Sequence, residues 1–295
     1  MKYILIILVI ALIGTGYIYR EDIGVRLAGS EQKKDKKKDD DKKKDNKEAM
    51  SPEVQVIQQW SLPGRLKEVS GISYIDANRF ACVQDEEGVM FIYNTASGKI
   101  EKEIPFGGAG DYEGITLAGN TAYIVRSDGA LFEISNWKEN PETKQYETGL
   151  TAAHNVEGLV YDKKNNRLLL GIKDNEPSTK DYKGVYAFNL DSKRSEESPV
   201  YKIDMKSEAG TGKKKKGFKP SAIGLHPESN DLYVVDGPSS RLMVLNGDGS
   251  IKRVVNLGGS FEQPEGITFS PNGELFISSE GVRKPGNISK ITVDE

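Results

Sequence analysis

Short apolar runs separated by turn residues fill the chain from about residue 53 to its C-terminus. They are rich in Val, Ile, Phe and Tyr, and residues such as Asn78 bound them, so each run predicts a β-strand. Four consecutive runs therefore predict one antiparallel sheet of four strands: Gly71–Ile75, Arg79–Gln84, Gly88–Asn94 and Lys99–Phe106.

A six-residue pattern beginning the first strand of this sheet recurs along the chain. Complete copies contain Glu-Gly at residues 113–114, 157–158 and 265–266, and two altered copies contain Ser70-Gly71 and Ser221-Ala222. Measured at the Glu or Ser, the five copies are separated by 43, 44, 64 and 44 residues. A period in the low forties is typical of β-propellers, and the longer interval indicates an insertion in the third copy.

The last copy ends after its third strand, whereas the strand Glu53–Leu62 belongs to no copy. If the N-terminal strand completes the last sheet, the array closes into a ring without open ends. The sequence thus predicts an all-β fold: a five-bladed β-propeller of four-stranded antiparallel blades over residues 53–295, closed by the N-terminal strand.

The N-terminal fifty residues differ in character from the rest. The apolar run within residues 1–20 predicts a single helix serving as a membrane anchor or a signal segment, and we favour the uncleaved anchor. Residues 21–52 include a nearly pure Lys/Asp stretch, which predicts a disordered tether. The expected location is a membrane, with the propeller on its outer side.

Composition excludes some functional classes. The net charge of −3 gives no electrostatic reason to expect nucleic acid as a partner. The single cysteine, Cys82, excludes an intramolecular disulfide and reads as a small core residue.

The recurring glutamates are the main candidates for chemistry. If the repeats superpose, Glu113, Glu157 and Glu265 converge near the propeller axis, with Ser70 and Ser221 at the other two positions. Converging carboxylates repel one another unless a cation or water screens them. Oxygen ligands without His or Cys favour a hard ion such as calcium. The structural alternative is that Glu-Gly is a turn element in which Glu caps backbone N–H groups.

A second set of acids follows each first position by 15 to 17 residues, at the ends of the second strands. A hairpin returns the chain to the same end of the blade, so these acids could line the same face. The set comprises Asp85, Asp128, Asp174, Asp236 and Glu280.

The Glu-Gly segments at 111–115 and 155–159, the segment 219–223 and the long run 263–280 resemble the SdiA-regulated (YjiK-like) family, itself distantly similar to NHL repeats. The resemblance covers residues 53–295 and the N-terminal anchor. It implies a five-bladed propeller with a calcium site, attached to the bacterial inner membrane and facing the periplasm or exterior. It carries calcium contact onto Glu113, Glu157 and Glu265, and more weakly onto Asp174 and Asp236, but Ser70 and Ser221 exclude a fivefold acidic ring.

The favoured function is a calcium-binding module, tethered outside the cytoplasmic membrane, that binds a small ligand or an envelope protein. The alternative is a calcium-dependent hydrolase, similar to propeller phytases or lactonases, using the acidic channel mouth. Its catalytic residues are not identifiable: His154 reads as an ordinary loop histidine, and Arg126 and Lys173 are the only cations near the acids. A structural scaffold is a third, weaker interpretation.

Overall fold

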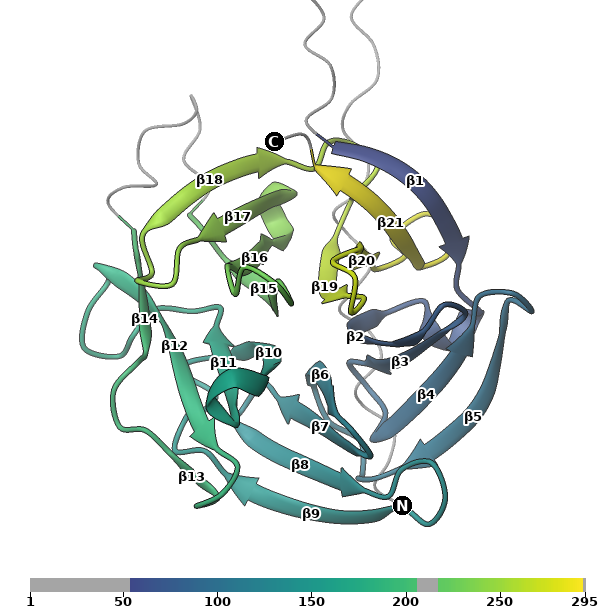
Figure 1. Ribbon diagram of the computed structural model, residues 1–295, viewed down its shortest axis with the longest axis horizontal. Coiled ribbons are helices and arrows are strands. Elements are labelled where there is room, and N and C mark those ends of the chain that lie inside the picture. The colour runs from purple at the N-terminus through teal and green to yellow at the C-terminus, as the bar shows by residue number, and fades with distance from the viewer. Residues whose placement is uncertain (1–53, 206–216, 294–295) are drawn as a thin grey trace, which may run out of the picture. The chain divides into compact units, whose positions relative to one another are not determined.

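A computed structural model describes residues 54–205 and 217–293. Within them, five antiparallel sheets surround a common axis, which confirms the predicted all-β five-bladed propeller (Figure 1). The predicted anchor (1–20) and tether (21–52) lie outside the described residues. No helix in the two described stretches is long and apolar enough to cross a membrane.

The first two blades follow the predicted order of strands. Blade 1 comprises β2 (Val69–Asp76), β3 (Arg79–Gln84), β4 (Val89–Asn94) and β5 (Lys99–Pro105). Blade 2 comprises β6 (Tyr112–Ala118), β7 (Thr121–Arg126), β8 (Ala130–Ser135) and β9 (Glu142–Glu147). The short 3-10 helix η1 (Gly64–Leu66) precedes blade 1.

Blade 3 has a divided outer strand. It comprises β10 (Val156–Asp162), η2 (Lys163–Asn165), β11 (Arg167–Ile172), β12 (Tyr182–Asn189), β13 (Arg194–Ser195) and β14 (Tyr201–Asp204). Both β13 and β14 pair with β12, at opposite ends of it. The extra residues predicted for the third copy thus separate two short segments where the other blades have one strand.

The last two blades complete the ring. Blade 4 comprises β15 (Pro220–Leu225), β16 (Leu232–Asp236), η4 (Gly237–Ser239), β17 (Arg241–Leu245) and β18 (Ile251–Asn256). Blade 5 comprises β19 (Pro264–Phe269), β20 (Leu275–Ser279), β21 (Asn287–Val293) and β1 (Val54–Ser61). In this blade β1 pairs antiparallel with β21, from Val54 opposite Val293 to Ser61 opposite Asn287.

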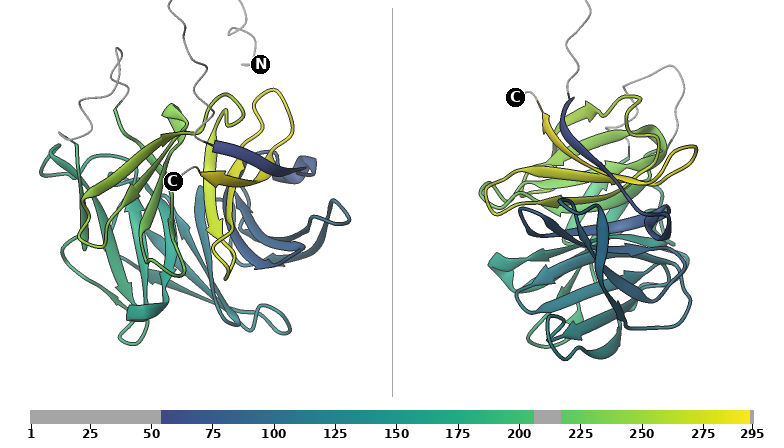
Figure 2. Two further views of the ribbon diagram at one scale, coloured as in Figure 1. Left: turned by 45° about the horizontal axis from the view of Figure 1, so that its top comes forward. Right: turned by 90° about the vertical axis from the view of Figure 1, so that its right-hand side faces the viewer.

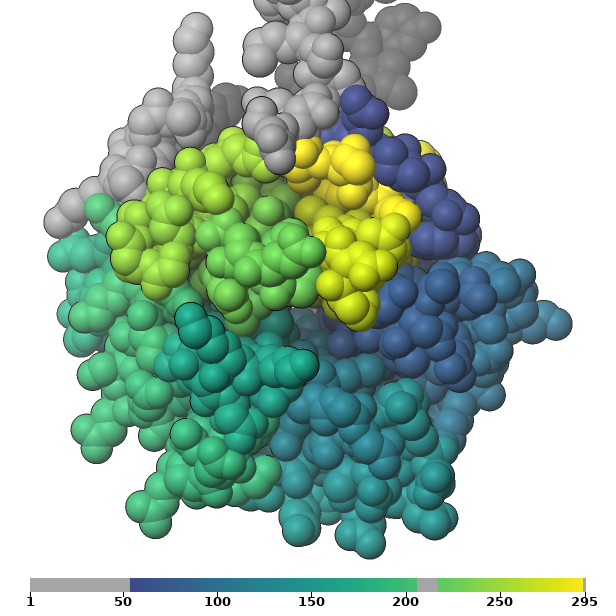
Figure 3. Space-filling view, in the orientation of Figure 1, coloured from purple at the N-terminus to yellow at the C-terminus, as the bar shows by residue number. Residues whose placement is uncertain are grey.

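The innermost strands of the blades, β2, β6, β10, β15 and β19, surround the axis. Each contacts the next, and β19 contacts β2. Figure 2 shows the blades from two further directions, and Figure 3 shows one face of the propeller, hollowed where the blades meet. Residues at the starts of all five inner strands line one cavity, so these starts lie at one end of the axis.

The hydrophobic core is divided into five clusters, and each cluster joins two neighbouring blades. Between blades 5 and 1, for example, the rings of Phe80 and Phe276 lie 5.0 Å apart, and Trp60 of β1 packs against both. Fully burying one such side chain contributes roughly 1.5–3 kcal/mol. The ring is thus stabilised by contacts between blades as well as by the strand ladders within them.

Candidate functional site

All five inner strands contain a β-bulge at the recurring Glu or Ser. In β6, Tyr112 pairs with Arg126 and Gly114 with the adjacent Val125, so Glu113 is the extra residue. Glu157, Ser221 and Glu265 are extra residues in the same way, and in β2 the irregularity spans Ser70 and Gly71. Because a bulge re-aims the side chain that it inserts, the repeat turns equivalent side chains toward the axis.

Glycines that follow the recurring Glu or Ser permit close packing between inner strands. A Cβ atom on Gly114 would lie 2.7 Å from Leu159 Cβ in the next blade, and one on Gly71 would lie 2.9 Å from the Glu113 carbonyl oxygen. Both distances are shorter than real Cβ contacts, so a side chain here would push neighbouring blades apart. The Glu-Gly pair thus combines an axial side chain with a close inter-blade contact.

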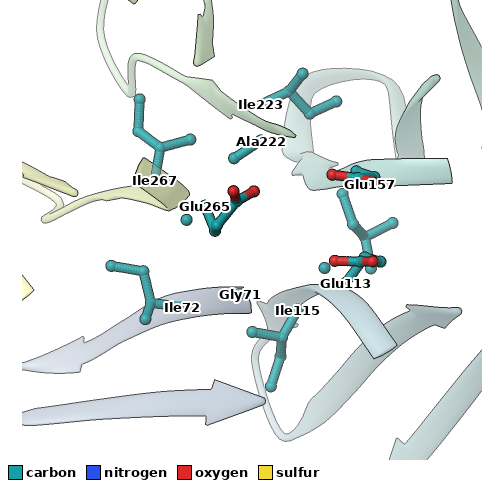
Figure 4. Close-up of a pocket in the computed structure, with 12 residues that line it drawn as sticks. Gly71, Ile72, Glu113, Ile115, Glu157, Ala222, Ile223, Glu265 and Ile267 are labelled. Atoms are coloured by element: carbon teal, nitrogen blue, oxygen red, sulfur yellow. The ribbon is translucent and has the colours of Figure 1, made fainter. Parts of the chain in front are cut away.

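The carboxyl groups of Glu113, Glu157 and Glu265 line one small axial cavity (Figure 4). Its walls are otherwise apolar side chains and backbone of the inner strands, including Ile115 and Ile267. The cavity volume is about 10 Å³, which is the space that a single water molecule needs. The three glutamates therefore share one cavity. The structural alternative, in which each glutamate caps its own turn, would not require a shared cavity.

The two serines at the remaining positions bond to the neighbouring blade. Ser70 Oγ donates to the Tyr112 carbonyl at 2.6 Å, and Ser221 Oγ donates to the Pro264 carbonyl at 2.7 Å. Both side chains are buried. Two of the five axial positions thus join blades, and three carry carboxyl groups.

Lys173, which follows β11, supplies a positive charge to this cluster. Its Nζ lies 2.7 Å from Glu157 Oε1, and Glu157 is only 2% exposed. Burial alone would lower the pKa of Lys173, but the nearby carboxylates of Glu157, Glu265 and Glu113 outweigh that effect and raise it. The sequence identified Lys173 only as a cation near acids, because residue spacing does not show which acid it reaches.

Burial raises the pKa values of all three axial glutamates. The pKa of Glu113 rises to about 10, since desolvation is reinforced by Glu157 and Asp111. That of Glu157 rises to about 8 and that of Glu265 to about 7, in both cases through desolvation that Lys173 partly opposes. One ammonium group therefore compensates the three carboxyl groups incompletely.

The second set of predicted acids does not form a continuous ring. Asp236 is fully buried and pairs with Arg241, whose Nη2 lies 2.6 Å from Oδ2. Asp128 pairs with Arg126, and Asp174 lies 3.8 Å from Lys219. Neither Asp174 nor Asp236 lines the axial cavity, in contrast to the expectation that they join the three glutamates. The reason is local: Arg241 is directly opposite Asp236 in the β16–β17 ladder.

Asp85 and Glu280, the other two members of the second set, face further acids. Desolvation raises the pKa of Asp85 to about 6, with Glu68, Glu280 and Asp111 adding to the effect. Glu280 accepts a hydrogen bond from Gln263 at 2.7 Å, and burial also raises its pKa. Negative charge thus accumulates around the end of the axis where the inner strands begin.

Several buried polar atoms at this end have no hydrogen-bond partner among the described residues. They are Asp85 Oδ1, Glu157 Oε2, Ser278 Oγ and Ser279 Oγ. Such atoms are rare in native proteins, and an ion, a ligand or ordered water commonly satisfies them.

The donor set fits a hard cation in its chemistry, because it consists of carboxyl oxygens, carries excess negative charge when all three glutamates are ionised, and leaves Glu157 Oε2 unpartnered. The geometry is not ready-made. Across residues 54–205 and 217–293, no three or more His, Cys, Asp or Glu side chains are grouped so that they could hold a metal ion. A cation would therefore require the carboxylates to move and Lys173 to leave Glu157.

Solved structures similar to this one share its fold at low sequence identity. Glutaminyl cyclase of Myxococcus xanthus aligns with a TM-score of 0.60 and 14% identity, over 82% of this chain and 96% of that one. A streptogramin B lyase aligns with a TM-score of 0.50 and 11% identity, over 82% and 98%. A luciferin-regenerating enzyme aligns with a TM-score of 0.50 and 14% identity, over 76% and 77%. At these identities the similarity concerns the fold alone.

Sequence comparison identifies a family. No curated protein sequence matches the chain. The sequence model described as "SdiA-regulated" matches residues 46–283, which include most of the propeller and all five recurring segments. The chain therefore belongs to the SdiA-regulated family.

Proposed function

We propose that this protein is a binding module whose axial glutamates take up a hard cation, calcium being the ion that their chemistry favours. The observation that carries the proposal is the shared cavity, where buried Glu157 and half-buried Glu113 and Glu265 lie near a single ammonium group and Glu157 Oε2 lacks a partner. The bound ion would shape the acidic end of the axis for a small ligand or an envelope protein.

Charge compensation is the physical reason for this proposal. Carboxylates in a poorly solvated site either take up protons or attract cations, because each uncompensated charge is costly to bury. Lys173 compensates one charge, so ionisation of all three glutamates leaves two uncompensated negative charges. Calcium carries two positive charges and competes with protons for these carboxylates. Calcium binds roughly six to eight oxygen atoms, and water can provide those that the glutamates do not.

The test is calcium titration of the full chain by calorimetry, with magnesium as the comparison ion. We expect calcium binding and a higher melting temperature in the unmodified protein, and loss of both in Glu157→Gln. Glu142→Gln on the exposed outer strand β9 is the matched control and should bind calcium normally. Equal calcium responses in Glu157→Gln and the unmodified chain would contradict the proposal.

The same samples separate a binding module from a hydrolase. Incubation with calcium and panels of phosphate esters and lactones should give no turnover if the protein only binds. Turnover that requires calcium and disappears in Glu157→Gln would replace the binding module with the calcium-dependent hydrolase.

The propeller is, in this proposal, held outside the cytoplasmic membrane. Two features of the sequence favour this location: the apolar run within residues 1–20 and the Lys/Asp-rich stretch of residues 21–52 that follows. Fractionation of cells should recover the full-length chain with the inner membrane even after an alkaline wash, and protease added to spheroplasts should digest the propeller. A chain recovered in the cytosol, or protected in spheroplasts, would contradict this location.

A further inference from the structure

The outer strand of blade 5 differs from the other outer strands in its sequence. β1 reads Val-Gln-Val-Ile-Gln-Gln-Trp-Ser and contains neither a charged residue nor proline. The strands β5, β9, β14 and β18 each carry at least one Lys or Arg, and β5 also ends in proline. Charges and proline are the usual means by which exposed sheet edges avoid pairing with other chains, so β1 is the least protected of these edges.

β1 also exposes two large apolar side chains to solvent. Val56 is 41% exposed and Ile57 is 54% exposed. Among residues 54–205 and 217–293, Val282 is the only other exposed large apolar side chain. Ile57 is the extra residue of a bulge between Val56 and Gln58 in the pairing with β21, and this bulge is the one protective feature of the strand.

A groove lies next to this exposed pair. It has a volume of about 980 Å³, lies between blades 4 and 5, and is lined by Ile57, Tyr233, Phe269 and Val293 among other side chains. Ion pairs flank it, because Lys252 reaches Asp231 at 2.7 Å and Lys290 reaches Glu274 at 2.5 Å. Side chains of a strand added beside β1 would alternate in direction, so every second one could lie over this groove.

We propose that β1 is a self-association edge, at which β1 of a second copy of this chain pairs antiparallel, with the two Ile57 side chains near the twofold axis. A twofold interface places the same surface on both sides, so any charged residue near its centre would face its own equivalent. β1 has no charge to repel in this way, whereas β18, with adjacent Lys252 and Arg253, would oppose like charges. Because β1 is uncharged, it can pair with a second copy of itself without repulsion, and it offers no charge by which a different partner would be recognised.

The test measures the mass of the full chain in detergent by light scattering or sedimentation over a wide range of concentrations. We expect a concentration-dependent dimer, and we expect Ile57→Lys to weaken it by more than about tenfold. Gln145→Lys, on the exposed outer strand β9, adds the same charge at a different edge and should leave dimerisation unchanged. Circular dichroism should show the same β content in both variants.

A second measurement identifies the edge directly. The described cysteine Cys82 is buried, so a cysteine introduced by Ile57→Cys offers the accessible thiol. We expect oxidation to link two chains through residue 57 in the dimer, and Gln145→Cys to link far less. A chain that remains monomeric at all concentrations, a dimer unaffected by Ile57→Lys, or equal cross-linking at both positions would overturn the proposal.

Discussion

Lys173 pairs with Glu157 at 2.7 Å, and its charge also acts on Glu113 and Glu265. We expect Lys173→Met to raise calcium affinity by more than about tenfold, because the ammonium group competes with an incoming ion for Glu157. In the presence of a chelator the same variant should lose about 2 kcal/mol of stability, since removal of one partner leaves a buried charge uncompensated. Calorimetry and thermal unfolding measure the two effects, and unchanged calcium affinity would show that Lys173 and calcium do not compete.

The axial glutamates also predict how stability depends on pH. Their pKa values in the folded protein, about 10 for Glu113, about 8 for Glu157 and about 7 for Glu265, exceed the ordinary value of 4.5. The folded chain therefore binds more protons than the unfolded chain above pH 4.5, and its stability falls as pH rises from there through these values. We expect the free energy of unfolding, measured with a chelator present, to decrease between about pH 5 and about pH 8.

Glu113→Gln isolates one contribution to this slope. The amide cannot ionise, so the variant should be more stable than the unmodified chain by about 1 kcal/mol at high pH, and its pH dependence should be weaker. For a domain of this size, this corresponds to a melting temperature higher by about 2–4 °C. Glu142→Gln on β9 should leave the slope unchanged, and an equal slope in Glu113→Gln would contradict the pKa assignment.

At the scale of single elements, the inner strands depend on their glycines. Gly114→Ala would place Cβ 2.7 Å from Leu159 Cβ, so we expect a loss of about 1–3 kcal/mol. Gly64→Ala is the matched control, because its Cβ would meet no atom within 4 Å. Denaturant unfolding measures both, and a Gly114→Ala variant as stable as Gly64→Ala would show that the blades can separate without cost.

The strands could be predicted from the sequence, but the bulges within them could not. Apolar alternation located nearly every strand within a few residues, since burial of one face against a neighbouring blade dictates that pattern. A bulge adds one residue without changing composition, so Glu113-Gly114 gave no sign of it beyond its recurrence. The ion pair between Asp236 and Arg241 could not be predicted either, because it depends on the register between β16 and β17.

At the scale of the whole propeller, β1 supplies the outer strand of the last blade. We expect a chain that begins after Ser61 to lose its cooperative thermal transition, because deletion exposes β21 and removes Trp60 from the cluster with Phe80 and Phe276. A chain that begins at Met50 is the control and should unfold as the full chain does. Melting followed by circular dichroism tests this, and equal transitions in the two truncated chains would contradict it.

Ser70 and Ser221 give the ring a direction that five equivalent repeats would lack. Their hydroxyl groups are committed to carbonyls of the adjacent blades, so acidic side chains reach the centre from blades 2, 3 and 5 alone. A guest at the centre would then have one preferred rotational setting about the axis instead of five interchangeable ones. Substituting glutamate for either serine would weaken that preference, because the site would then approach fivefold symmetry and no longer fix one orientation.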